Sequence, residues 1–434
     1  FAAPDIPMKS LRFNAAGEGV LKRTPGSASN QDTYTWSAWI KRSGSQTAGG
    51  YQVLFGTGDT STSSQSSIWI VGNDNYWGIY WGGSPGPQHR AKQEPCDPSA
   101  WYHLVCAVDT TESTANDMAK LYMNGVRVTA YQEQTEQSQN TDTYINQAAI
   151  HAIGGSGEST SAHFFHGYMA EVHFVDGAVL TPSTFGETGD NGEWNPIVAP
   201  AGITYGTNGF YLNFAESTAD ATGIGLDTSG NGNNWTPTNI TATDQMIDSP
   251  TNNFATFNSI LTGIQYADPT LSEGNLEVSV PTNSYTASTI SPPSGKWYNE
   301  FYLKTLGSSN GETAVGWIQT DYSQTTSHAS HADCWHVYYN GYSTNKIEFW
   351  DETSGTVETN LTVAAGDIFQ CALDIDNLKG WVGINDTWYA ADGGADGDPA
   401  TGANPTFTFT TAEATSLVAM VGNGNGTDVW VANF

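Results

Sequence analysis

The sequence predicts a nearly all-β protein that contains two β-sandwich domains, and three observations predict this fold class. Windows with apolar residues at i, i+3, i+4 and i+7, which would indicate helices, are almost absent from the 434 residues. Short runs of β-branched and aromatic residues recur instead, each bounded by Gly, Asn, Ser or Asp. The 47 glycines provide turns between these runs. We therefore expect strands at residues 34–40, 51–55, 103–108, 120–123, 209–214 and 368–373.

Two segments with the same pattern, one in each half of the chain, indicate two related sandwiches. Residues 106–109 read Cys-Ala-Val-Asp and lead through a polar loop to an Asn-Gly turn within residues 121–125. Residues 371–374 read Cys-Ala-Leu-Asp and lead to an Asn-Asp turn within residues 381–386. Each pair is typical of a buried strand that returns through a hairpin. Between the two halves, residues 186–255 are rich in Thr, Asn, Gly and Asp, and they predict an Asn/Gly-rich connector with one strand.

The charge balance restricts the classes of partner. The chain has 14 Lys and Arg against 44 Asp and Glu, which gives a formal net charge of −30 at pH 7. Because such a charge repels phosphate backbones and anionic lipids, we expect no nucleic acid and no membrane as a partner. No stretch approaches the roughly 20 apolar residues that a membrane-spanning helix requires.

Four motifs in the first half follow the order of one family of sandwiches. They are the aromatic strand 34–42, which ends in Lys-Arg, then Trp-Tyr-His-Leu-Val at 101–105, Leu-Tyr-Met-Asn-Gly at 121–125 and the closing strand 165–174. With these motifs, residues 9–185 resemble a LamG domain, which has a concanavalin A-like jelly-roll fold. The resemblance implies a scaffold on which variable rim loops carry the function.

The second half contains motifs of a different sandwich family. They are Ser-Gly-Lys-Trp-Tyr-Asn-Glu at 294–300, Val-Gly-Trp at 315–317 and an Asp-rich strand and turn at 366–377. With these motifs, residues 256–434 resemble a SPRY domain. The tandem order of the two domains, joined through segment 252–256, resembles virion-associated fibre or decoration proteins of marine bacteriophages. This resemblance implies a place at the virion surface or otherwise outside the cell, with other virion proteins as neighbours.

The sequence predicts no catalytic site. Retaining glucanases of the concanavalin A-like class carry a carboxylate pair in the pattern Glu-x-Asp-x-x-Glu, with the two groups about 5–5.5 Å apart. That spacing is absent, and the nearest acidic run, residues 348–352, lacks the i, i+2 pair and lies in the SPRY-like half. His103 and Cys106 lie three residues apart on one expected strand, so they point to opposite faces. We expect a protein that is not an enzyme.

One loop has the spacing of a calcium site. Asp227, Ser229, Asn231 and Asn233 place oxygen atoms at alternate positions, with a glycine at the sixth position, as in the first half of an EF-hand loop. The twelfth position is Thr238, where an EF-hand has Glu. Calcium as a cofactor and a plain Asx-rich turn therefore both remain open.

Aromatic residues bordered by Asn, Asp and Gly are candidates for stacking on sugar rings. The candidate ligand contacts are Trp77, Tyr80 and Trp81 in the first half, and Tyr339 and Tyr342 in the second half. The alternative is that these rings belong to the core. Trp77 and Trp81 would share one face of a strand, as core residues do, which leaves Tyr80 on the other face.

The leading functional hypothesis is adhesion or surface decoration on a phage particle, without catalysis. The partner would be a glycan or a surface protein of the bacterial host. Because single sugar contacts are weak, we expect several copies acting together as a homo-oligomer. One alternative is a secreted enzyme that acts on polysaccharide, with one sandwich holding the substrate and the other cutting it. The other alternative is a purely structural virion component without a ligand.

Overall fold

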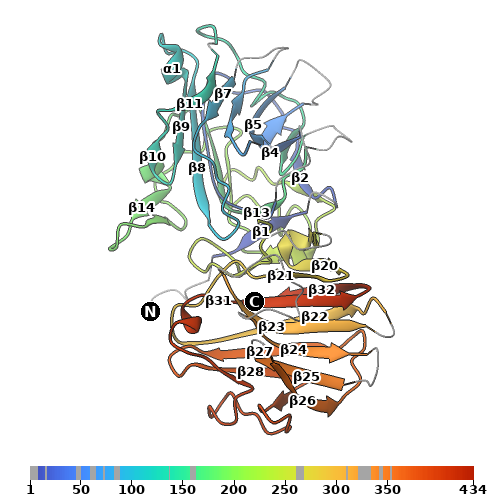
Figure 1. Ribbon diagram of the computed structural model, residues 1–434. Helices are drawn as coiled ribbons and strands as arrows, with labels where there is room; N and C mark the ends of the chain where they lie inside the picture. The colour runs from blue at the N-terminus through green and yellow to red at the C-terminus, as the bar shows by residue number, and fades with distance from the viewer. Residues whose placement is uncertain are drawn as a thin grey trace, which may run out of the picture. The chain divides into compact units, whose positions relative to one another are not determined.

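The computed structural model confirms the all-β prediction (Figure 1). Among the described residues the only α-helix is α1 (Ala115–Met118), and 3-10 turns are short. No helix in this described part is long and apolar enough to cross a membrane. The structure describes residues 8–14, 17–44, 50–58, 65–71, 74–82, 88–135, 137–156, 163–260, 268–308, 311–320, 334–341, 346–351 and 354–434, with the side chains of residues 115 and 354–359 left out.

The chain divides into two compact units, Phe1–Asn253 and Phe254–Phe434. Each unit is a sandwich of two large antiparallel sheets. In the first unit, sheet 1 follows the order β10-β9-β8-β3-β13-β1-β18, and β16 also pairs with β13. Its strands are β1 (Ser10–Phe13), β3 (Thr33–Arg42), β8 (Tyr102–Asp109), β9 (Ala119–Met123), β10 (Val126–Arg127), β13 (Gly167–Asp176), β16 (Phe210–Leu212) and β18 (Gln245–Met246).

Sheet 2 of the first unit follows the order β11-β7-β6-β5-β4-β12-β2-β17. Its strands are β2 (Val20–Arg23), β4 (Tyr51–Thr57), β5 (Ser66–Val71), β6 (Trp77–Tyr80), β7 (Gln88–Ala91), β11 (Tyr131–Gln134), β12 (His151–Ile153) and β17 (Thr236–Thr238).

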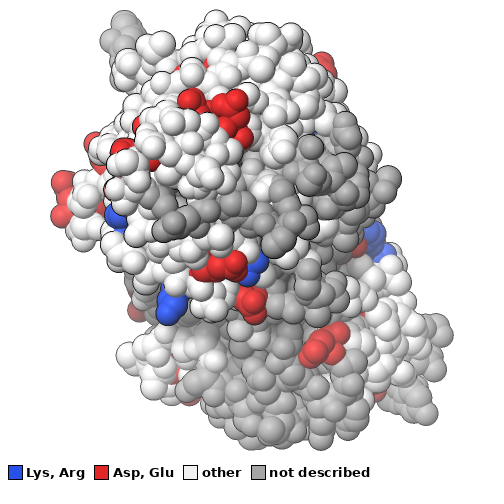
Figure 2. Space-filling view, turned by 90° about the horizontal axis from the view of Figure 1, so that it is seen from above, with Lys and Arg blue, Asp and Glu red and all other residues white. Residues whose placement is uncertain are grey.

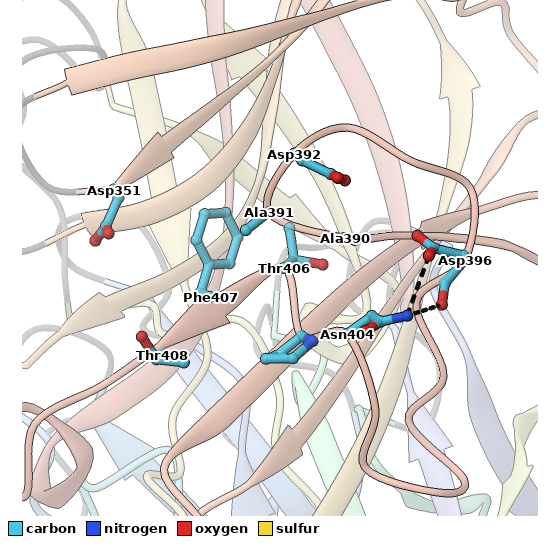
Figure 3. A pocket seen from close by; sticks show the side chains of 10 residues that line it. Asp351, Ala390, Ala391, Asp392, Asp396, Asn404, Thr406, Phe407 and Thr408 are labelled. Carbon is cyan, nitrogen blue, oxygen red and sulfur yellow. Dashed lines mark hydrogen bonds between the residues drawn. The ribbon is translucent and has the colours of Figure 1, made fainter.

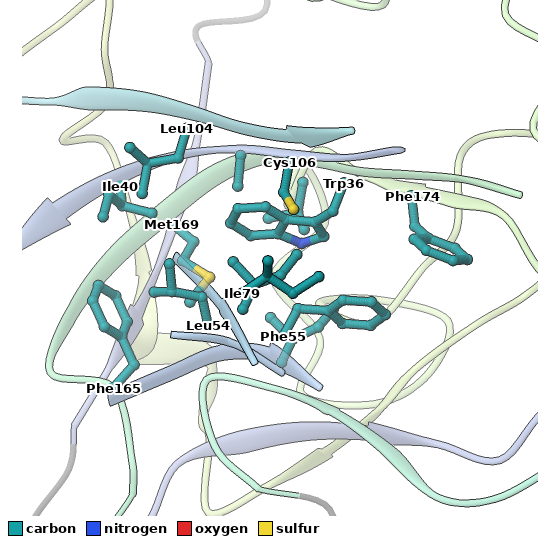
Figure 4. Packing of buried hydrophobic residues seen from close by; sticks show 14 of the residues in the cluster. Trp36, Ile40, Leu54, Phe55, Ile79, Leu104, Cys106, Phe165, Met169 and Phe174 are labelled. Carbon is teal, nitrogen blue, oxygen red and sulfur yellow. The ribbon is translucent and has the colours of Figure 1, made fainter. Parts of the chain in front are cut away.

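The core of the first unit lies between these two sheets. Trp36 and Ile40 of β3 pack in one cluster with Leu54 and Phe55 of β4 and Ile79 of β6 (Figure 4). The inward side chains of a strand recur every second residue, which is why the alternating aromatic and β-branched runs form strands here. Burial of each such side chain stabilises the fold by about 1.5–3 kcal/mol.

The segment expected to be a connector with one strand, residues 186–255, differs from that expectation. It contains the hairpin β14 (Gly186–Thr188) and β15 (Trp194–Pro196), and three further short strands that complete the two large sheets. These are β16 beside β13, β17 beside β2 and β18 beside β1. β16 is the strand expected at residues 209–214. The other strands have only two or three residues each, so the segment shows no periodicity that would have predicted them.

The second unit repeats the two-sheet arrangement. Sheet 3 has the order β19-β20-β32-β22-β27-β28-β29, with β30 also paired to β28, and sheet 4 has the order β21-β31-β23-β24-β25-β26. The sheet 3 strands are β19 (Thr270–Ser272), β20 (Glu277–Pro281), β22 (Lys296–Thr305), β27 (Ile368–Asp374), β28 (Lys379–Ile384), β29 (Thr387–Tyr389), β30 (Phe407–Thr408) and β32 (Thr427–Asn433). Those of sheet 4 are β21 (Ser284–Ala287), β23 (Glu312–Gln319), β24 (Cys334–Asn340), β25 (Lys346–Asp351), β26 (Ser354–Asn360) and β31 (Leu417–Asn425).

Candidate functional site

The structure corrects three of the five aromatic residues that were candidates for sugar contact. Trp77, Trp81 and Tyr339 are at most 2% exposed and belong to the cores of their units. A ligand cannot reach these rings while the sandwich is closed. Tyr80 is partly exposed and lies on the face of β6 opposite Trp77. Tyr342 lies outside the described residues.

The outer face of sheet 2 carries aromatic side chains around Tyr80 that the sequence did not single out. Tyr51 of β4 is 37% exposed, and its ring meets the ring of the buried Trp69 edge-on, with 4.5 Å between centroids. On its other side Tyr51 stacks on His163 at 5.7 Å. The guanidinium of Arg90 lies over the Trp69 ring, 5.1 Å from its centroid. The exposed Tyr51 ring is thus held between Trp69 and His163, and Arg90 covers Trp69.

A polar frame borders these rings. Arg90 Nη1 lies 3.3 Å from Glu133 Oε2 in an ion pair, and Arg90 Nε donates to Gln88 Oε1 at 3.1 Å. Gln88 Nε2 in turn donates to Glu133 Oε1 at 2.7 Å. We call the set Tyr51, Trp69, Tyr80, Gln88, Arg90 and Glu133 the Tyr51 surface.

Gly78 makes the contact between Arg90 and Trp69 possible. Strand pairing places Gly78 between them in one cross-strand row, opposite Trp69 on one side and Arg90 on the other. Because Gly78 has no side chain, the guanidinium can cross it and lie on the indole. A Cβ at this position would stand 1.7 Å from the carbonyl oxygen of His89, so the backbone permits no other residue without moving.

The oxygen-rich loop at residues 227–233 is an ordered turn whose polar groups bind protein partners. The buried Asp227 carboxylate accepts three backbone N–H groups, from Tyr211 (2.9 Å), Ser229 (2.9 Å) and Asn233 (2.8 Å). Ser229 Oγ accepts from the Asn231 backbone N–H at 3.2 Å, and the amides of Asn231 and Asn233 donate to carbonyl groups of the preceding loop. The carboxylate therefore ties the loop to β16, and calcium binding there stays a prediction.

A pocket of about 410 Å³ lies in the second unit, and three of its ten lining residues are acidic (Figure 3). Asp351, Asp392 and Asp396 contribute carboxylates. Asn404 Nδ2 donates to the backbone oxygen (3.0 Å) and to Oδ2 (3.1 Å) of Asp396, so part of this lining is already paired. The only aromatic ring in the lining, that of Phe407, is buried. Within the described part of the chain, no group of three or more His, Cys, Asp or Glu could hold a metal ion.

A buried Ser–His pair in sheet 1 has the wrong hydrogen-bond pattern for catalysis. His103 Nε2 lies 2.8 Å from Ser37 Oγ, and both residues are at most 1% exposed. The Trp194 indole N–H donates to His103 Nδ1 at 3.0 Å, so the ring proton of neutral His103 is on Nε2 and is donated to Ser37. Burial lowers the pKa of His103 to about 3. His103 therefore has no free lone pair with which to accept the serine proton.

One family of known proteins matches the sequence of the first unit. Residues 17–184 match the family model of the Concanavalin A-like lectin/glucanases superfamily, in its laminin G form. This match supports the concanavalin A-like fold that the LamG motifs predicted for the first unit. No curated protein sequence matches the chain.

Solved structures similar to this chain come from several kinds of sandwich protein. A putative carbohydrate binding protein from Bacteroides ovatus is 19% identical, with a TM-score of 0.36 over 54% of this chain and 59% of that one. A native heptameric SAP-like pentraxin from Limulus polyphemus is 15% identical, with a TM-score of 0.31 over 41% of this chain and 80% of that one. The SPRY domain of human HERC1 is 19% identical, with a TM-score of 0.27 over 38% of this chain and 91% of that one.

Proposed function

We propose that the protein is a non-catalytic carbohydrate-binding protein that holds glycan against the Tyr51 surface of its first unit. The observation that carries this proposal is the exposed Tyr51 ring, fixed edge-on against Trp69 beside the Arg90–Gln88–Glu133 frame. It supports the proposal because a sugar ring packs its C–H face on an aromatic ring while charged and amide groups bind its hydroxyls. The concanavalin A-like match over residues 17–184 adds support, since that superfamily includes lectins by name.

The absence of catalysis is part of the proposal. The superfamily named by the match also includes glucanases, which cut glycans. Two observations argue against cutting here: the sequence lacks the Glu-x-Asp-x-x-Glu pattern, and His103 is committed to donating its proton to Ser37. Incubation with polysaccharides should therefore leave the concentration of reducing ends at background, and a steady rise would favour the enzyme hypothesis.

We further propose that the protein acts on the outside of a phage particle, in several copies, with host surface glycan as its partner. The tandem order of two sandwiches supports this location, and the net charge of −30 disfavours adhesion to nucleic acid released from lysed cells. Figure 2 shows several groups of acidic side chains on the face in view, with scattered basic ones. Labelled antibody should decorate intact particles, whereas labelling of disrupted particles alone would contradict the surface location.

Glycan binding is tested by comparing two arginines that have similar surroundings. Arg90 lies over Trp69 and pairs with Glu133, and Arg127 lies over the Tyr122 ring at 5.5 Å and pairs with Asp117 at 3.8 Å. In affinity electrophoresis through polysaccharide gels, Arg90→Ala should bind about tenfold more weakly than the wild type. Arg127→Ala is the control and should bind like the wild type.

Removal of the stacking ring gives a second arm of the same experiment. Tyr51→Ala should also weaken binding, and Tyr51→Phe should retain most of it, because the ring and not the hydroxyl makes the contact. Equal retardation of the wild type, Tyr51→Ala and Arg90→Ala would move the site away from the Tyr51 surface. Retardation of the wild type by no polysaccharide would favour the structural virion component.

A further inference from the structure

The outer face of sheet 3 in the second unit exposes an unusual amount of aromatic surface. Along β22, Phe301 and Leu303 point into the core, while Tyr298 and Tyr302 are 49% and 43% exposed on the outer face. Ile368 of β27 lies opposite Tyr302 and is also exposed. Strands at the middle of a sheet that face water usually carry polar side chains, so exposed rings here point to a binding surface.

A network of hydrogen bonds fixes the Tyr298 hydroxyl. Tyr298 donates to Glu300 Oε1 at 2.6 Å and accepts from Gln370 Nε2 at 3.2 Å. The largely buried Gln370 also donates to Asp386 Oδ1 at 2.7 Å and accepts from the Asp386 backbone N–H at 2.7 Å. Burial and the bond to Glu300 raise the pKa of Tyr298 to about 12, so the hydroxyl keeps its proton at neutral pH.

Trp388 of β29 adds a second ring beside Tyr298. The two ring centroids are 6.3 Å apart and the planes are tilted by 55°. Trp388 pairs across the strands with Gly383, where an added Cβ would stand 3.0 Å from the indole Cδ2 atom. The absence of a side chain at Gly383 therefore lets the indole lie close against the sheet. The ring is held by the strand beneath it and remains partly exposed.

The polar groups around these rings lie in one cross-strand row. Strand pairing places Asn433, Glu300, Gln370, Gly383 and Trp388 side by side on β32, β22, β27, β28 and β29. Asn433 Nδ2 also lies 3.4 Å from Glu300 Oε2. The row offers carboxylate acceptors and amide groups at fixed positions next to two rings.

We propose that this face is a second, independent carbohydrate-binding site, and that it takes an uncharged glycan. We call the set Tyr298, Glu300, Gln370, Asp386, Trp388 and Asn433 the Tyr298 surface. Two held rings provide stacking for the C–H faces of sugar rings, and the carboxylate and amide groups of the row bind hydroxyls. All six residues lie in the second unit, so this site does not depend on the Tyr51 surface of the first unit.

The charge of this face selects an uncharged ligand. Glu300 and Asp386 bring negative charge to the rings, while the lysines of the same strand are already paired. Lys304 Nζ lies 2.7 Å from Glu277 Oε2, and Lys296 Nζ lies 3.6 Å from Asp374 Oδ2. Uronic acids and sulfated sugars would therefore meet repulsion without a cation to offset it. A purely apolar partner is also disfavoured, because it would cover the charged Glu300 and Asp386 carboxylates and remove them from water.

The test uses the full chain in affinity electrophoresis against mannan, galactan, starch and β-glucan, with alginate as the anionic probe and polylysine as the cationic one. At least one neutral polysaccharide should retard the wild type. Trp388→Ala should bind it about tenfold more weakly, and Trp388→Phe should retain an intermediate affinity because a ring remains. The control is Trp297→Ala, which removes a more exposed indole whose N–H donates to the Ser294 carbonyl, and it should bind like the wild type.

Single and double variants of the two surfaces distinguish the two sites. Tyr51→Ala should leave retardation through the Tyr298 surface intact. The double variant Tyr51→Ala, Trp388→Ala should show no retardation at all. If Tyr51→Ala alone abolishes all binding, the second site is refuted while the proposed function stands. If Trp388→Ala alone abolishes all binding, the second site is supported and glycan binding at the Tyr51 surface is refuted. The second site is refuted if no neutral polysaccharide retards the protein, or if polylysine alone retards it. Melting temperatures confirm that each variant is folded.

Discussion

Lys41 of β3 and Asp248, which are separated by 207 residues in the chain, form a buried ion pair with 2.8 Å between Nζ and Oδ2. Asp248 Oδ1 also accepts from the Trp101 indole N–H at 3.0 Å, and Lys41 Nζ donates to Asn253 Oδ1 at 2.8 Å. The end of segment 186–255 is thereby fastened to sheet 1 by charged hydrogen bonds. Buried pairs of this kind specify one arrangement and are costly to break.

We predict that Asp248→Ala lowers the free energy of unfolding of the first unit by about 3–5 kcal/mol, because it removes the carboxylate that pairs with the buried Lys41 ammonium. Urea unfolding followed by tryptophan fluorescence measures the change. Asp220→Ala, at an exposed loop position, is the control and should change stability by less than about 0.5 kcal/mol. An equal effect of both variants would show that the ion pair does not stabilise the fold.

The buried histidines predict a loss of stability in mild acid. Burial lowers the pKa of His103 and His173 to about 3 and of His89, His151 and His166 to about 4, against an ordinary value of about 6.5. The unfolded chain therefore binds more protons below pH 6.5, and stability falls as the pH decreases from there towards 4. Each histidine contributes a slope of about 1.4 kcal/mol per pH unit.

The slope of stability against pH distinguishes the protonation of a buried histidine from the loss of its packing contacts. In His173→Gln the free energy of unfolding should fall less steeply between pH 6.5 and 4 than in the wild type, whatever its value at pH 7. Urea unfolding at several pH values measures both slopes. Parallel curves would mean that His173 is not held neutral in the folded state.

Glu171 predicts the opposite dependence between about pH 4.5 and 7. Burial raises the pKa of its carboxyl to about 7, even though the Tyr211 hydroxyl donates to Oε2 at 2.5 Å. A raised carboxyl pKa contributes stability that is fully present below the unfolded pKa and is lost as the pH rises towards 7. Glu171→Gln keeps an acceptor for Tyr211 and cannot ionise, so the stability of the variant should rise relative to that of the wild type between pH 5 and pH 7. Thermal melts at both pH values compare the two proteins.

We expect the Asp227 carboxylate to stabilise the fold with or without calcium. Asp227→Ala leaves three backbone N–H groups without their acceptor, and we expect a loss of about 1–3 kcal/mol in calcium-free buffer. Millimolar calcium should raise the melting temperature of the wild type slightly, because one carboxylate gives a weak site, and should not affect the variant. An equal calcium shift in both proteins would place the ion elsewhere.

The sequence predicted the sandwich cores better than the binding surfaces. Alternation along the chain is a local pattern, so it placed Trp77 and Trp81 on one side of the expected strand and Tyr80 on the other. The contact of Arg90 with Trp69 depends on the register of three strands, which no local pattern reveals. Gly78 is visible in the sequence, but its position between Trp69 and Arg90 in one cross-strand row is not.

The Tyr298 surface was missed for a related reason. The run at 294–300 was used only as a motif of a fold, and the partners of Tyr298 lie about 70 to 90 residues further along the chain. Gln370, Asp386 and Trp388 come together only when β27, β28 and β29 pair. Long-range pairing in β-proteins therefore limits how far sites can be predicted from sequence alone.

The return of segment 186–255 to both sheets has a practical consequence for anyone who would produce the first unit by itself. A fragment cut at residue 184, where the family match ends, would lose β16, β17 and β18 and leave β1, β2 and half of β13 with open backbone edges. Exposed edges of this kind recruit strands from other molecules and precipitate as aggregates. A fragment that continues to Asn253 keeps those edges closed and retains the partners of Lys41, and it should stay in solution where the shorter one does not.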